Sequence, residues 1–364
     1  MTSKRFSKAL AAIITIFFLA NAILYFGWVD NKSFGADGHG DLANLASMAW
    51  SKSLTEQKRY ERHHLELDDY LERINNGEAI KVDVLTIGDS FTNSGGGAFY
   101  QDYLATKYDL TVVNVPSNRI KGLEALGMVE VLRNNGMLTK IKPKVVIVES
   151  VERYLFGRYD DANYLANVPA LDELTVIKNF TKNKTKPVEK QDKIFPGYMV
   201  KRNINYLHEQ SQKWRNKERD VSFAKLNKNT FTAVGRENEL MYITWDFTNP
   251  KVNSDVEQTA KNIQTVADNL KAMGIELIFL PCPDKSSVYY PFLQSDGREY
   301  AAKPELDELL AVKRDYYMVD AKHILQQAVA DGVVDVYWAD DTHWSWRGFE
   351  IVVDEMMKNI NIVK

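Results

Sequence analysis

Short β-branched strands and amphipathic helices alternate through most of the chain. Strand-like apolar runs stand at 82–87, 110–115, 144–149, 275–280 and, more briefly, 317–320. Helical patterns are predicted between and after them, at 98–107, 122–138, 255–273, 304–312, 323–330 and 347–357. Near-continuous apolar strands separated by helices are typical of a parallel sheet covered on both faces. The pattern predicts an α/β fold, a three-layer sandwich with a central parallel sheet.

Two segments depart from this alternation. Residues 31–79 are polar, and the spacing of apolar positions between Asp41 and Asn75 predicts one or two helices, which we interpret as a stalk that also packs on the domain. The α/β domain then occupies 80–364, with an insertion at about 156–250. The insertion contains a lysine-rich stretch, which is either a solvated face or a surface for an acidic polymer: Lys178, Lys182, Lys184, Lys186, Lys190 and Lys193.

The N-terminus predicts a membrane segment within residues 1–30. Three basic residues precede an apolar run of about 20 residues, from Ala9 to Val29, which is long enough to span a bilayer. Because the positive charges lie only on the N-terminal side, everything after Val29 is expected outside the cytoplasm, in the periplasm or at the cell surface. Ala20-Asn21-Ala22 leaves open a cleaved signal peptide, although the apolar run continues through Trp28 and favours an uncleaved anchor. Both alternatives export the same domain.

Composition excludes several classes of protein. The 364 residues carry 46 basic and 49 acidic side chains, a net charge of −3, which gives no general attraction for nucleic acid. The one cysteine, Cys282, cannot form an intramolecular disulfide. The six histidines are scattered, so no zinc site of the four-ligand type is indicated.

Two motifs suggest acyl-transfer chemistry. Gly88-Asp89-Ser90 directly follows the first strand, which places Ser90 at the carboxyl edge of the sheet, near a helix N-terminus whose N–H groups could stabilise an oxyanion. Residues 339–344 contain Asp340, Asp341 and His343 just before the last helix. A serine hydroxyl needs an adjacent base, and a carboxylate orients that histidine. Each motif alone could be a helix cap; together they predict a Ser-His-Asp site.

These residues resemble a known superfamily. The strand followed by Gly88-Asp89-Ser90 and the C-terminal Asp/His pair are similar to SGNH (GDSL) hydrolases, and Asp341-Thr342-His343-Trp344 resembles the alginate-acetylation branch, the AlgJ/AlgX-like polysaccharide O-acetyltransferases. Residues 148–153 and 281–291 also resemble segments of that branch. The likeness covers roughly 80–155 and 255–360, and it implies an SGNH-like (flavodoxin-like) fold behind a single N-terminal transmembrane helix.

The resemblance assigns roles to individual residues. Ser90 would be the nucleophile, His343 the general base and then the general acid, and Asp341 the carboxylate that orients His343. Asp340 stays an alternative, since many SGNH enzymes place that aspartate three residues before the histidine.

The Gly-x-Asn-Asp block that usually completes the oxyanion hole is missing after the third strand. The Ser90 N–H is therefore the expected oxyanion donor, with Asn118, Gly122 and Arg153 as further candidates. Trp344, beside His343, is the candidate for a substrate wall, against the alternative of core packing.

The resemblance implies O-acetylation of an extracellular polysaccharide, with the acetyl donor delivered by a membrane-bound O-acyltransferase and the protein tethered beside it. An esterase or deacetylase of a cell-surface polymer, or a non-catalytic polysaccharide-binding scaffold, are the alternatives. No metal and no diffusible cofactor is expected, because a Ser-His-Asp mechanism needs neither.

Overall fold

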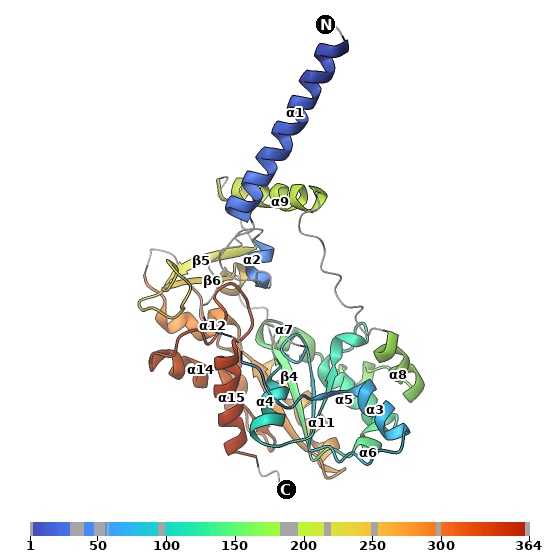
Figure 1. The fold of residues 1–364 in the computed structure, drawn as a ribbon. Helices are drawn as coiled ribbons and strands as arrows, with labels where there is room; N and C mark the ends of the chain where they lie inside the picture. Colours follow the sequence, from blue (N-terminus) through green and yellow to red (C-terminus); the bar gives the residue numbers. More distant parts are fainter. Residues whose placement is uncertain are drawn as a thin grey trace.

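A parallel sheet forms the centre of the computed structural model (Figure 1). The structure describes residues 3–29, 40–46, 55–56, 58–93, 99–182, 196–214, 220–248, 254–295 and 300–360. Within these ranges the sheet has six strands in the order β1-β3-β2-β4-β7-β8, and every pairing in it is parallel. The strands are β1 Leu65–Glu66, β2 Val84–Gly88, β3 Val112–Pro116, β4 Val145–Val151, β7 Glu276–Cys282 and β8 Tyr317–Met318.

The predicted three layers are present, because each face of the sheet has its own core. Successive residues of a strand point to opposite faces: Val84 and Val145 belong to one core, and Leu85 and Val146 to the other. The first core is covered by α4 Tyr100–Lys107, α12 Lys285–Tyr289, α14 Ala321–Ala330 and α15 Trp346–Lys358. The second is covered by α3 Leu67–Asn75, α5 Ala125–Asn134, α6 Met137–Ile141, α7 Glu152–Tyr159, α11 Val256–Lys271 and α13 Glu305–Ala311.

Two predicted helices have different bounds. The helix expected at 122–138 is divided into α5 and α6, because Gly136 between them adopts a φ of +81°, a left-handed conformation that interrupts an α-helix. The helix expected from Ala98 begins at Tyr100. Ser90 therefore lies in a turn that precedes the helix by several residues.

The segment predicted as a stalk reaches into the sheet. Within 31–79 the structure describes α2 Asp41–Leu45, the short strand β1 and α3. β1 pairs with β3, aligning Leu65 with Val113, and so forms one edge of the sheet. Residues 47–54 lie outside the described residues.

The region predicted as an insertion contains α8 Glu173–Lys182, α9 Pro196–Trp214, α10 Trp245–Thr248 and an antiparallel pair, β5 Val221–Lys225 with β6 Glu239–Ile243. Of the lysine-rich stretch, only Lys178 and Lys182 lie on a described element, α8; the other four lysines fall outside the described residues.

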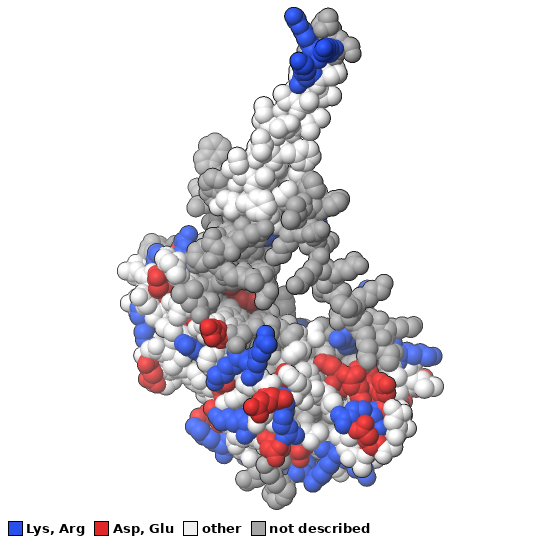
Figure 2. Space-filling view, in the orientation of Figure 1, with Lys and Arg blue, Asp and Glu red and all other residues white. Residues whose placement is uncertain are grey.

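The N-terminal helix projects away from the α/β domain (Figure 1). Helix α1 Ser3–Leu24 continues into a π-helical turn, η1 Tyr25–Val29. The stretch Lys4–Gly27 is 24 residues long with a mean hydropathy of 2.3, and 6% of its most apolar window is buried. Basic side chains gather at its free end (Figure 2). A helix of this kind fits single-pass membrane anchoring.

Candidate active site

Ser90 and His343 meet at the carboxyl edge of the sheet. Ser90 follows β2 directly, in the turn that also contains Phe91. His343 lies just before α15, whose N-terminus is capped by the Ser345 side chain. Although 253 positions separate them, His343 Nε2 lies 2.8 Å from Ser90 Oγ. The Phe91 ring packs on the imidazole with centroids 4.7 Å apart, which limits the movement of the histidine.

Asp341 is the carboxylate on the other imidazole nitrogen. Its Oδ1 lies 2.6 Å from His343 Nδ1 and also accepts a 2.9 Å hydrogen bond from the His343 backbone N–H. Asp340 points elsewhere and accepts a 2.8 Å bond from the Gly40 N–H. Burial lowers the pKa of His343, but the hydrogen bond and charge of Asp341 outweigh it and raise the pKa above its usual value.

A buried glutamate shapes the turn that carries the serine. Glu149 Oε2, on β4, accepts hydrogen bonds from the Asp89 N–H at 2.8 Å and the Thr92 N–H at 3.1 Å. A Cβ on Gly88 would lie 2.3 Å from this same Oε2 and 2.3 Å from Thr92 Oγ1, so only glycine fits at that position. In the sequence, Glu149 is a charged residue after an apolar run and lies in the segment 148–153 noted for its resemblance, and neither feature indicates this role.

Two carboxyl groups at the turn, Glu149 and Asp89, have pKa values that are shifted in opposite directions. Burial and the neighbouring Asp89 charge raise the pKa of Glu149 well above its usual range, which favours the neutral form of this carboxyl group. Burial raises the pKa of Asp89, but hydrogen bonding to Glu149 and the charge of Arg158 outweigh it and lower the pKa. Arg158 Nη1 donates to Asp89 Oδ2 at 2.6 Å. The turn is therefore held by two carboxyl groups and a guanidinium.

The N-terminal segment contacts the histidine loop directly. Asp41 Oδ1 accepts a 2.7 Å hydrogen bond from the Thr342 N–H, and Asp41 Oδ2 accepts another from the Thr342 hydroxyl. In return the Asp41 N–H donates to Asp341 Oδ2 at 3.1 Å, and Asp41 Oδ2 lies 3.6 Å from His343 Nδ1. No feature of the sequence indicates this role for Asp41, because a contact across 300 positions has no local signal.

Gly40 permits this close approach. A Cβ there would lie 2.2 Å from the Asp340 carbonyl oxygen, closer than any side chain allows. The Ala43 N–H donates to the same carbonyl at 3.2 Å. Helix α2 is therefore seated on the backbone of the histidine loop.

Lys285 supports the same loop from inside the protein. Its ammonium, 1% exposed, donates to the Trp338 and Ala339 carbonyl oxygens at 2.8 and 2.9 Å. Burial lowers the pKa of Lys285 to about 8, against the opposing effect of Asp340 and the other nearby carboxylates. Lys285 belongs to the segment 281–291, which was noted for its resemblance. This segment thus fixes the backbone of residues 338 and 339, just before Asp341.

The predicted oxyanion candidates differ in placement. The Ser90 N–H has no hydrogen-bond acceptor within the described part of the chain. Asn118 lies in η4 Ser117–Arg119, directly after β3, and its side chain falls outside the described part. Gly122 has a φ of +76° and nothing within 4 Å of its Cβ direction, so it serves a turn. The positive charge of Arg153 lowers the pKa of His343, although the larger effect of Asp341 raises it. The Arg153 Nε donates a 2.7 Å hydrogen bond to Asp284.

Trp344 is part of the core, which corrects its assignment as a substrate wall. The side chain is 3% exposed, and its ring nitrogen donates a 2.8 Å hydrogen bond to the Tyr337 hydroxyl. Its ring packs edge-on against Phe91 at 5.0 Å. An indole buried in this way supports Phe91, and through it the imidazole, and has no surface left for a sugar ring.

Three residues at the site could in principle bind a metal ion. Asp41, Asp341 and His343 offer ligand atoms within 4.8 Å of one another, but a metal ion there would have to break the 2.6 Å bond between His343 and Asp341.

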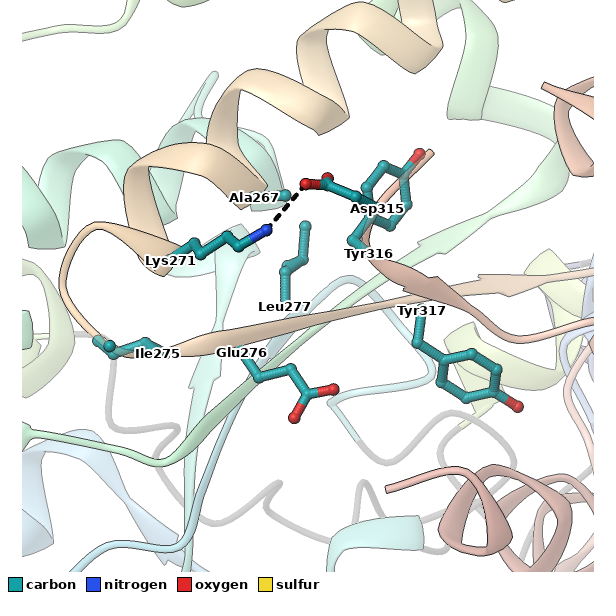
Figure 3. Close-up of a pocket in the computed structure, with 9 residues that line it drawn as sticks. Ala267, Lys271, Ile275, Glu276, Leu277, Asp315, Tyr316 and Tyr317 are labelled. Carbon is teal, nitrogen blue, oxygen red and sulfur yellow. Dashed lines mark hydrogen bonds and ion pairs between the residues drawn. The ribbon is translucent and has the colours of Figure 1, made fainter. Parts of the chain in front are cut away.

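A depression of about 280 Å³ lies between α11, the start of β7 and β8 (Figure 3). An ion pair of Lys271 with Asp315 borders it. It is at the amino end of β7, and Ser90 follows the carboxyl end of β2, so the depression is at the opposite edge of the sheet.

An α/β domain with a serine, a histidine and an aspartate in contact beyond the carboxyl ends of parallel strands is of the SGNH hydrolase-like class. Residues 234–363 match a family model described as SGNH hydrolase-like domain, acetyltransferase AlgX. This part of the chain is therefore similar to SGNH hydrolase-like domains of the AlgX type. It contains Asp341 and His343, whereas Ser90 lies outside the matched residues and is brought to them by the sheet. No curated protein gives a significant match to the chain.

Proposed function

We propose that the protein transfers an acetyl group to an extracellular polysaccharide through an acyl-serine intermediate on Ser90. The observation that carries the proposal is the pair of contacts made by His343, 2.8 Å to Ser90 Oγ and 2.6 Å to Asp341 Oδ1. One imidazole that bridges a hydroxyl and a carboxylate is the arrangement that makes serine nucleophilic. The AlgX-type family match favours an acetyl group and a polysaccharide acceptor.

The first half-reaction acylates the enzyme. Ser90 Oγ attacks the carbonyl carbon of the donor while His343 Nε2 takes the hydroxyl proton. The Ser90 N–H, which has no acceptor within the described residues, is the proposed donor to the oxyanion. His343 then gives the proton to the leaving group as the donor's acyl bond breaks, and the acetyl ester on Ser90 remains.

The second half-reaction returns the enzyme to its starting state. A sugar hydroxyl attacks the acetyl ester while His343 Nε2 takes its proton. Collapse of the intermediate breaks the bond to Ser90 Oγ, which regains the proton, and the acetyl ester is now on the sugar. Asp341 keeps Nε2 directed at Ser90 and stabilises the imidazolium in both halves.

The N-terminal apolar helix suggests that the acyl transfer takes place at a membrane surface. We propose that residues 1–30 anchor the protein, with the domain outside the cytoplasm and residues 31–79 connecting the two. The acetyl donor would come from a membrane-bound O-acyltransferase, and a tethered acceptor enzyme meets such a partner at a high effective concentration.

Hydrolysis is the second candidate function, favoured by one observation. Ser90 is an exposed residue, so water can reach an acyl group on it. An esterase would use the same three residues and pass the acetyl group to water.

The test uses the intact protein in detergent with a chromogenic acetyl ester and short oligosaccharides, followed by mass spectrometry of the sugars. We expect acetylated sugar from the wild type, and a loss of roughly 10⁴-fold in acylation rate with Asp341→Asn, the scale known for such triads. Asp340→Asn is the matched control, since that carboxylate faces Gly40, and should retain most of the activity. Acetate release without acetylated sugar would support the esterase. Equal rates in the two variants would refute the assignment of Asp341.

A further inference from the structure

Helix α9 has an apolar side that α1 covers only in part. Around the helix, with about 3.6 residues per turn, the side that faces α1 contains Met199, Asn203 and Tyr206. Beside them on the same apolar arc lie Ile204 and Leu207, 60% and 53% exposed. The opposite side of the helix is polar and exposed, and it presents Lys201, Asn205 and His208.

α9 is joined to the membrane helix by specific contacts. The Asn203 amide, 2% exposed, donates to the backbone oxygen of Asn21 at 2.8 Å and to its side-chain oxygen at 3.0 Å. Met199 packs against Tyr25 in a small cluster of its own. Asn21 is the strongly polar residue within the apolar run, and α9 satisfies it. Amide side chains that pair in this way hold helices together in membranes. Figure 1 shows α9 lying across the C-terminal end of α1.

The depth of this contact along α1 matches one boundary of a bilayer. Lys4, Arg5 and Lys8 mark the end of α1 at one membrane face (Figure 2). At 1.5 Å per residue, Asn21 lies about 20 Å beyond Lys8 and Tyr25 about 25 Å, against a hydrocarbon core of about 30 Å. α9 therefore meets α1 near the opposite boundary of the core.

We propose that α9 is an interfacial membrane helix. It would lie in the plane of the membrane, at the face opposite to the basic end of α1, with Ile204 and Leu207 among the lipid acyl chains. An amphipathic helix in this position buries its apolar side about 5–10 Å into the boundary between headgroups and chains. The exposed half of the apolar arc adjoins the lipid-facing surface of α1, and the polar side faces water. The inference goes beyond the proposed acyl transfer and rests on α1 being a membrane anchor.

The consequence is a fixed orientation of the domain. A single spanning helix allows the attached domain to tilt about its exit point. A second helix that crosses the first and lies in the interface removes much of this freedom, because tilting would lift the apolar side chains of Ile204 and Leu207 out of the apolar layer and into water.

The test places single fluorescent labels on introduced cysteines of the full chain in vesicles of phosphatidylcholine and phosphatidylglycerol. Cys282 is fully buried and does not compete for the label. Ile204→Cys and Leu207→Cys report the apolar side of α9. Lys201→Cys and Asn205→Cys, on the polar side of the same helix, are the matched controls. Ile13→Cys reports α1 itself, where the side chain is 63% exposed. Each label is quenched either by spin-labelled lipid or by aqueous iodide.

We expect the labels at 204 and 207 to be quenched severalfold more by lipid than by iodide, and those at 201 and 205 to show the reverse. Equal iodide quenching at all four positions, with 13 quenched by lipid, would overturn the proposal while leaving the anchor intact. Protection of 204 and 207 from both quenchers would also overturn it, since another protein or a second copy would then cover the face. Failure of lipid to quench position 13 would refute the anchor and, with it, this inference. None of these results depends on the acetyltransferase activity.

Discussion

His64, at the edge of the sheet, should make the free energy of unfolding of the domain depend on pH. Its Nδ1 lies 2.7 Å from Asp102 Oδ1 and its Nε2 lies 3.2 Å from Glu66 Oε1, next to the edge strand β1. Burial lowers the pKa of His64, but these two carboxylates outweigh it and raise the pKa to about 9. The charged imidazole therefore joins the segment before β1 to α4.

The size of the effect follows from the difference between the folded and unfolded pKa of His64. A rise from the unfolded value of about 6.5 to about 9 corresponds to roughly 3 kcal/mol. Since the folded pKa is the higher one, this stabilisation is fully present below about pH 6.5 and is lost as pH rises through about 9.

The measurement compares wild type with His64→Gln by urea unfolding of the intact protein in detergent, at pH 6 and pH 9. The difference in free energy of unfolding between the two proteins should shrink by about 3 kcal/mol from pH 6 to pH 9. His63→Gln is the matched control, because the His63 side chain is 70% exposed and should contribute little. A difference that stays constant with pH, or one as large for His63→Gln, would refute the reasoning.

Three further predictions concern the active site. Gly88→Ala should abolish acylation and destabilise the fold by 1–3 kcal/mol, seen in rate and urea midpoint, because its Cβ would meet Glu149 at 2.3 Å; a wild-type rate would contradict the turn. Asp41→Ala should slow acylation about tenfold, about 1.4 kcal/mol, by releasing Thr342, with ester KM unchanged; an unchanged rate would show that Asp41 is dispensable. Acylation should rise with pH through the raised pKa of His343, since only the neutral imidazole accepts the serine proton; a flat profile from pH 5 to 9 would contradict this.

The sheet could be predicted from sequence because its strands are buried on both faces. Runs such as 82–87 and 144–149 are apolar almost throughout, which distinguishes them from amphipathic helices. β1 could not be predicted, since two residues carry no periodicity and Leu65–Glu66 becomes a strand only by pairing with β3. The division between α5 and α6 had a local signal in Gly136, because a glycine inside a helical pattern indicates a possible break in the helix.

The candidate site was predictable where its parts are local. Gly88-Asp89-Ser90 and the Asp/His pair each stand within a few residues, and the order of strands brings the two together. The choice between Asp340 and Asp341 required coordinates, because both are close enough in sequence to reach an imidazole. Asp41 was not predictable, since it reaches Thr342 across 301 positions. Trp344 was placed wrongly because proximity to His343 in sequence does not reveal which way an indole points.

The proposed mechanism requires Ser90 to carry the acyl group, and trapping that group on the protein shows whether it does. Intact wild-type protein and the His343→Ala and Ser90→Ala variants would be incubated briefly with the acetyl ester, quenched in acid, digested and examined by tandem mass spectrometry. We expect an acetyl ester on Ser90 in the wild type, far less in His343→Ala and none at that position in Ser90→Ala. An acetyl group on another residue, with turnover unchanged in Ser90→Ala, would contradict it.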